Sequence, residues 1–121
     1  MVSRKIEDDV ITYFDGAKSF AIFNETEIDS GILITLTGEL RSEIANDLLD
    51  ELVAFTTVGA NVIIDFEKVI YISSTVQHVL LRVQQKMDAM KKGTLTLRKL
   101  QPNIYQEFEK TGASELLMIE T

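Results

Sequence analysis

The sequence predicts a single α/β domain, a mixed and mostly parallel β-sheet of four to six strands with helices packed against it. Short apolar runs rich in β-branched residues, such as residues 62–66, are typical of buried strands. Longer stretches with helical periodicity lie between them, the clearest at residues 76–87. Because strands that alternate with helices join by right-handed crossovers, most of the sheet is expected to be parallel.

The predicted order of elements is strand, strand, helix, strand, helix, strand, helix, strand. The first two strands, at residues 20–28 and 32–37, enclose a turn at residues 29–31 and form an antiparallel hairpin. The later strands are expected at residues 62–66, 94–97 and 116–119.

Each predicted helix has recognisable start and stop signals. Ser42 is suited to cap the first helix, which Gly59 closes. Residues 73–75 all carry hydroxyls and begin the central helix, for which Gly93 is the expected end. Pro102 fits the first turn of the last helix, where a missing N–H costs nothing.

Residues 1–19 are interpreted as an N-terminal extension of a domain that occupies residues 20–121. Within the extension, residues 10–14 have the pattern of a short strand, and Asp15 and Gly16 form a turn signal behind it. The alternative is a loosely attached arm. The extension could add a strand, cover a sheet edge or mediate dimerisation, so a homo-oligomer stays open.

Composition limits the kinds of partner and chemistry. The 121 residues carry a formal charge of -7, which argues against nucleic acid or an anionic membrane as the main partner. With one histidine and no cysteine, a metal site and thiol chemistry have no support, and no motif suggests a cofactor. No apolar run approaches the ~18 residues of a membrane span, and no signal peptide is recognisable, so a cytoplasmic protein is expected.

The junction between the strand at residues 62–66 and the central helix is the predicted functional centre. The apolar residues of that helix recur at i, i+3, i+4, i+7 and i+11, which places them on one face: Val76, Val79, Leu80, Val83 and Met87. The hydroxyls of residues 73–75 lie where free backbone amides and positive partial charge collect at a helix start. In parallel sheets, ligands and partners meet the strand ends that lead into helices.

Taken in order, five segments resemble the STAS domain, the module of bacterial anti-sigma factor antagonists. The resemblance covers residues 20–120 and implies the STAS fold. The segments are the strand leading into Gly38-Glu39-Leu40, then Val62-Ile63-Ile64-Asp65-Phe66, Tyr71-Ile72-Ser73-Ser74, Gly93-Thr94-Leu95-Thr96-Leu97 and Thr111-Gly112-Ala113-Ser114-Glu115-Leu116-Leu117.

The resemblance implies a non-enzymatic regulator of transcription that needs no cofactor. Unphosphorylated, such a module binds an anti-sigma factor that is a serine kinase, and phosphorylation at the helix start switches it off. The family signature there is Asp-Ser-Ser/Thr-Gly, so the phosphorylated position corresponds to Ser73 and the second hydroxyl to Ser74. In this chain Ile72 replaces the aspartate and Thr75 replaces the glycine. The expected partner-binding surface comprises Glu39, Asp65, Lys68, Tyr71, Ser73, Ser74, Thr75 and Gln77.

Other interpretations of the same residues stay open. The altered signature favours a scaffold subunit of a STAS-containing assembly that is not phosphorylated. A small enzyme using Asp65, Ser73 or His78 is least favoured, because the sequence offers none of them an oriented partner. Hydroxyls at a helix start also serve as plain caps, the role expected for Ser74, and a carboxylate such as Asp65 also satisfies amides at a strand end.

Overall fold

The computed structural model describes residues 1–120 and contains one seven-stranded sheet with three α-helices. The helices are α1 (Ala45–Val58), α2 (Ser74–Met90) and α3 (Pro102–Thr111), and two 3-10 turns are η1 (Ser42–Ile44) and η2 (Ala113–Glu115). The strands, in both chain and spatial order, are β1 (Val2–Glu7), β2 (Val10–Asp15), β3 (Lys18–Ile28), β4 (Gly31–Leu40), β5 (Asn61–Ile72), β6 (Thr94–Arg98) and β7 (Met118–Glu120).

Strand pairing changes direction at β4. The pairs from β1 to β4 are antiparallel, and those from β4 to β7 are parallel. This confirms the predicted α/β class and mixed sheet, but seven strands replace the predicted four to six. The additional strand is β1, which is almost entirely exposed and carries Arg4, Lys5 and Glu7. An exposed edge strand shows no alternation of apolar and polar residues, so its sequence gave no strand signal.

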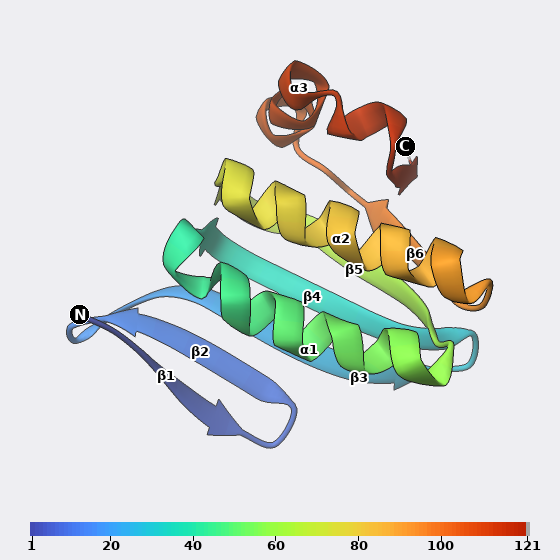
Figure 1. Ribbon diagram of the computed structural model, residues 1–121. Helices are drawn as coiled ribbons and strands as arrows, with labels where there is room; N and C mark the ends of the chain where they lie inside the picture. The colour runs from blue at the N-terminus through green and yellow to red at the C-terminus, as the bar shows by residue number, and fades with distance from the viewer. Residues whose placement is uncertain (121) are drawn as a thin grey trace.

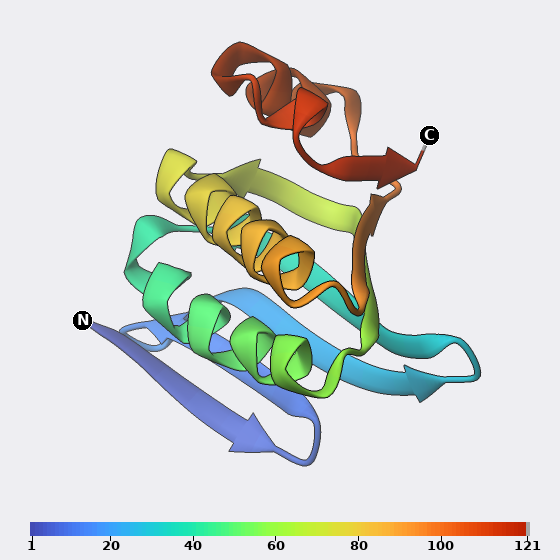
Figure 2. The ribbon, with the colours of Figure 1, turned by 45° about the vertical axis from the view of Figure 1, so that its right-hand side comes forward.

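The three helices pack on the same face of the sheet. Each crossover from β4 onward moves one strand further in the same direction, and right-handed connections of that kind place every helix on one side. Figures 1 and 2 both show α1 and α2 side by side over this face. Helix α3 follows beside α2, where Phe108 meets Phe66 of β5 edge to face with ring centroids 6.2 Å apart.

The core lies between this face and the helices. Ile34, Ile64 and Leu97 are register partners on three adjacent strands, and all three are fully buried. The helices cover the row with apolar residues that include Leu48 of α1 and Leu80 of α2. Burying a side chain of this size contributes about 1.5–3 kcal/mol, so this layer holds the strand ends in fixed positions.

Several element ends differ from the predictions. Ser42 opens the turn η1 and makes no cap bond, and α1 begins three residues later. Gly59 does close α1, with φ of 69°. Helix α2 ends at Met90, and its C-cap is Lys91 in the left-handed region, two residues before the expected Gly93. The largest difference is β5, which continues to Ile72 because Val69 and Ile72 bury themselves beyond the exposed pair Glu67 and Lys68.

Residues 1–19 are part of the sheet. The hairpin of β1 and β2 pairs with β3, and Ile11 and Tyr13 from β2 are buried in the core. The expected strand and turn at residues 10–16 are confirmed, with Gly16 at φ of 64°. The loosely attached arm was the wrong alternative.

Candidate functional site at the start of helix α2

The start of α2 lies at the ends of β4 and β5. Because these strands are parallel, Leu40 and Ile72 end at the same edge of the sheet, where they are register partners. The backbone N–H of Ser73 donates to the carbonyl of Leu40 at 3.0 Å. This bond ties the first residue after β5 to the last residue of β4 and fixes where the helix begins.

Ser73 is the N-cap of α2. Its backbone is extended, at φ -78° and ψ 157°, and its Oγ accepts a hydrogen bond from the N–H of Val76 at 3.2 Å. The residue is only 8% exposed. The capping role had been expected for Ser74, and the structure assigns it to Ser73 instead.

Ser74 and Thr75 form the first turn and are both exposed. The N–H groups of Val76 and Gln77 are taken by the side chain and carbonyl of Ser73. The amides of Ser74 and Thr75 belong to the initial set that has no acceptor within a helix. The turn therefore combines exposed hydroxyls with the positive end of a 17-residue helix.

A surface hollow of about 300 Å³ opens at the same sheet edge, at the ends of β4 and β5. Its lining includes Glu39, Arg41, Glu43 and Tyr71. Glu39 and Tyr71 are register partners at the ends of β4 and β5, and Tyr71 is 49% exposed. Both had been expected at the partner surface, and both lie at this edge.

Arg41 was not anticipated from the sequence. Its guanidinium donates to Glu39 and to Asp15, each at 3.1 Å, and lies over the ring of Phe20 at 4.2 Å from the centroid. One arginine in a loop carries no pattern of its own. Its proximity to the conspicuous Gly38-Glu39-Leu40 segment is the one signal that could have identified it.

Gln77 is not a surface residue. It is 3% exposed, and its Oε1 accepts a hydrogen bond from the hydroxyl of Thr111 on α3 at 2.7 Å. A polar residue one position after the apolar Val76 had been expected to face solvent. The placement of α3 beside α2 covers it, which sequence periodicity does not reveal.

Asp65 does not lie at the start of α2. It occupies the middle of β5, roughly 26 Å along the strand from Ser73 at ~3.3 Å per residue, and its register partners are Thr35 and Arg98. Its carboxylate accepts the N–H of Glu67 at 2.9 Å and lies 3.7 Å from the guanidinium of Arg98. Asp65 thus accepts a hydrogen bond from a backbone amide, as expected, but it does so inside a strand and not at a strand end.

Lys68 is also removed from the helix start. It pairs with Thr37 on the face of the sheet opposite the helices, and it is exposed. Asp65 and Lys68 were grouped with the serines because β5 was expected to end at residue 66. Since the strand runs six residues further, both side chains are carried away from the site.

Residues 1–120 contain no cluster of three or more His, Cys, Asp or Glu side chains placed to hold a metal ion. His78 is exposed on α2. No helix in the described part of the chain is both long and apolar enough to cross a bilayer.

Comparisons with known proteins agree on one fold. The model of the STAS domain matches residues 24–121. The anti-sigma factor antagonist SpoIIAA in its unphosphorylated form aligns with a TM-score of 0.68 and 20% identity, over 82% of this chain and 88% of that chain. The phosphorylated form of SpoIIAA from Bacillus aligns with a TM-score of 0.63 and 20% identity, over 82% and 91%.

A third structure, an anti-sigma factor antagonist from Mycobacterium paratuberculosis, gives a TM-score of 0.68 at 16% identity, over 82% of this chain and 84% of that chain. Among curated protein sequences there is no match. The family match starts at residue 24, so the hairpin of β1 and β2 lies outside it.

Proposed function

Because this chain belongs to the STAS domain family, we propose that it is an anti-sigma factor antagonist that binds an anti-sigma serine kinase through the start of α2. The observation that carries the proposal is the first turn of α2. This turn carries the exposed hydroxyls of Ser74 and Thr75, and its first backbone amides have no acceptor within the helix. A hollow lined by Glu39 and Tyr71 lies at the same edge of the sheet. A partner can reach this turn without any rearrangement of the fold. In this proposal the module acts by binding and not by catalysis.

We propose Ser74 as the phosphorylated residue, with Ser73 as the cap that supports it. Ser73 is 8% exposed as a residue, and its Oγ already accepts a hydrogen bond from the N–H of Val76, so transfer of a phosphate to that oxygen requires the cap bond to open. Ser74 is exposed one position later. The family signature alone points to Ser73, and accessibility favours its neighbour.

Phosphorylation at this turn changes the surface rather than the fold. A phosphate adds about -1.5 to -2 charges, and the helix dipole and free amides stabilise a negative group at an N-terminus. The lining of the hollow at this sheet edge already contains Glu39 and Glu43, while Arg41 is engaged by two carboxylates. The added charge weakens binding because the partner must then bury a phosphate that has no free cation in this lining to pair with, and each ~1.4 kcal/mol lost lowers affinity tenfold.

Affinity measurements with the partner kinase test this proposal. The partner is first captured from the source cell and identified by mass spectrometry, and its affinity is then measured by calorimetry. Ser74→Asp is expected to weaken binding at least tenfold, while Ser74→Ala keeps it. Incubation with the kinase and ATP should add one phosphate to the wild type and to Ser73→Ala, but none to Ser74→Ala. Equal affinity of Ser74→Asp and wild type would contradict the switch.

A scaffold role is the second candidate, and one observation favours it. Ile72 replaces the acidic residue of the signature and is 3% exposed, so it belongs to the core and offers no carboxylate beside the serines. A scaffold subunit would take up no phosphate from the kinase that it binds. Intact-mass measurement after that incubation separates the two roles.

A further inference from the structure

We propose that the sheet face opposite the helices is the interface of a homodimer. All three helices pack on one side, and among residues 1–120 no helix covers the other (Figures 1 and 2). Strands β4 to β7 are parallel, and parallel strands are ordinarily buried on both faces. A parallel sheet with helices on one face only therefore lacks the cover that its second face ordinarily has.

The centre of this open face is uncharged. Ile22, Leu33 and Ile63 on β3, β4 and β5 lie there among Thr35, Thr37 and Thr96, as cross-strand pairing shows. All six are half-buried, since neighbouring side chains shield one another. In a chain with 26% charged residues, a continuous uncharged patch marks a contact surface.

The charges on the open face flank this centre, on β5 and β6 at one end and on β1 at the other. Lys68 of β5 is exposed opposite Thr37, while Asp65, Lys5 and Glu7 are paired within the chain. Asp65 lies within 4 Å of both Arg98 and Lys99, at 3.7 and 3.9 Å. At the other end, Lys5 and Glu7 form an ion pair of 2.8 Å. The face therefore has an apolar and hydroxyl centre with a polar rim, the usual anatomy of a protein interface.

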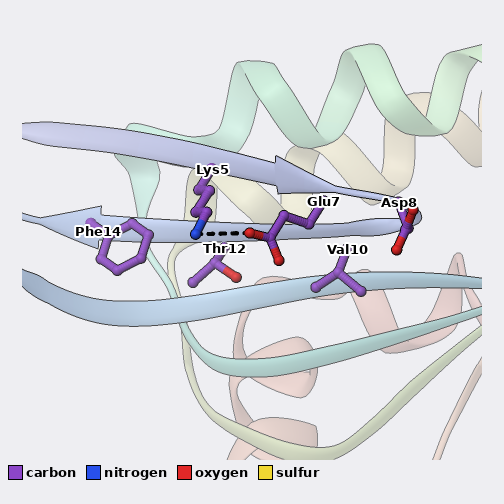
Figure 3. A pocket seen from close by; sticks show the side chains of 6 residues that line it. All are labelled: Lys5, Glu7, Asp8, Val10, Thr12 and Phe14. Atoms are coloured by element: carbon purple, nitrogen blue, oxygen red, sulfur yellow. Dashed lines mark ion pairs between the residues drawn. The ribbon is translucent and has the colours of Figure 1, made fainter.

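Figure 3 shows how the N-terminal hairpin extends this surface. Lys5, Val10, Thr12 and Phe14 project from one side of the hairpin and line a hollow of about 350 Å³. Thr12 is the register partner of Ile22, so the hairpin continues the same face outward from β3. This hairpin lies outside the family match, and it enlarges the open face by two strands.

Three considerations identify the occupant as a second copy of the chain. Each copy carries a formal charge of -7, so repulsion between two copies is least where they meet through a surface whose centre carries no charge. Threonine hydroxyls both donate and accept hydrogen bonds, so identical residues can pair across a two-fold axis. Seven strands at ~4.8 Å spacing and ~25 Å length give a face of roughly 700 Å², close to the ~800 Å² per partner of a stable interface.

Light scattering with charge variants tests the dimer. Thr35→Arg faces Asp65 and Thr37→Glu faces Lys68, so each introduced charge finds an opposite one within its own chain and the monomer fold is kept. Inside an interface the same charges are removed from water, which costs several kcal/mol per ion unless an opposite charge faces them. Gln85→Arg, at an exposed position on α2, is the matched control.

The wild type and Gln85→Arg are expected at twice the chain mass of 13.6 kDa, and both face variants at the single mass. Thermal melts recorded in parallel identify a variant that has lost its fold. If one face variant is unfolded, the mass of the other face variant tests the dimer. A wild type that stays monomeric up to its solubility limit overturns the proposal, as does a folded face variant that dimerises like the wild type. Neither result depends on the phosphorylation proposed for Ser74.

Discussion

Arg41 links Asp15 to Glu39, and with them a part of the chain outside the family match and a part inside it. Asp15 ends β2 in the hairpin outside the family match, while Glu39 ends β4 beside the start of α2. Both guanidinium bonds are 3.1 Å long. The N-terminal hairpin is therefore joined to the candidate site by one side chain, and its position bears on the surface that a partner would meet.

Replacing Arg41 tests this link. Arg41→Ala removes two ion pairs and the contact over Phe20, and because these groups are partly exposed we expect a loss of about 1 kcal/mol in the free energy of unfolding. Asp15→Ala keeps the pair with Glu39 and should cost less. Urea denaturation measures both. Equal effects of the two substitutions would show that the pair with Glu39 and the contact over Phe20 contribute nothing to stability.

The two serines are expected to differ in their effect on stability. Ser73→Ala removes the bond to the N–H of Val76 and should destabilise the protein by about 1 kcal/mol, the usual cost of a lost N-cap. Ser74→Ala changes an exposed first-turn residue and should stay within about 0.5 kcal/mol. Chemical denaturation at neutral pH compares them. The reverse order would place the cap on Ser74.

Gly38 is expected to tolerate no side chain. Its φ is 89°, and a Cβ built there would collide with the carbonyl oxygen of Phe20 on β3. Gly38→Ala should therefore lower the free energy of unfolding by about 3 kcal/mol or more, through strain in the left-handed region and displacement of β3. Gly16, with φ of 64° and open space around it, is the control: Gly16→Ala bears the backbone strain alone. Equal losses of stability in the two variants would mean that the contact between the new Cβ and the carbonyl of Phe20 is relieved without cost.

Tyr13 should make the protein sensitive to alkaline pH. Burial, together with the negative charge of Asp47, raises the pKa of its hydroxyl above the ordinary value. A raised pKa means that the folded state binds the proton more tightly than the unfolded state does. Stability is thus retained below the unfolded pKa of about 10 and falls as the pH rises above it, by up to ~1.4 kcal/mol per pH unit.

The variant Tyr13→Phe should lose this sensitivity. At neutral pH it should be as stable as the wild type or more so, because the Tyr13 hydroxyl is buried and finds no hydrogen-bond partner in the described part of the chain. Melting temperatures measured between pH 8 and pH 11 compare the two proteins. If the melting temperatures of the two proteins fall equally with pH, the loss of stability at alkaline pH comes from groups other than Tyr13.

Local pattern was sufficient for most of the architecture. The stripe from Val76 to Met87 predicted α2, and the buried run at residues 62–66 predicted the centre of β5. Gly59 marked the end of α1 because glycine readily adopts a positive φ, and Pro102 marked the start of α3 because proline has no backbone N–H to donate. Both properties belong to the residue itself. The same reasoning missed β1, whose exposed charged residues pair with β2 through backbone groups alone.

The candidate site was predicted less completely, because it depends on how far each element runs. Ser73 and Ser74 were placed correctly at the start of α2, but which hydroxyl caps the helix follows from a backbone angle and a contact with Leu40. Asp65 was assigned to the site because the strand was expected to span only residues 62–66, which placed Asp65 near its end. The buried Val69 and Ile72 extend that strand, and Asp65 is left far from the helix start.

The sequence by itself determined most helices and strands, their order and the hydroxyls at the N-terminus of α2, since periodicity and capping are local properties of the chain. Tertiary structure alone decided that Gln77 is buried against α3, that Arg41 joins Asp15 to Glu39, and that one face of the sheet lies open. Those outcomes depend on contacts between residues distant in the chain. Such contacts arise when the crossovers set which surfaces meet, and no local pattern records them.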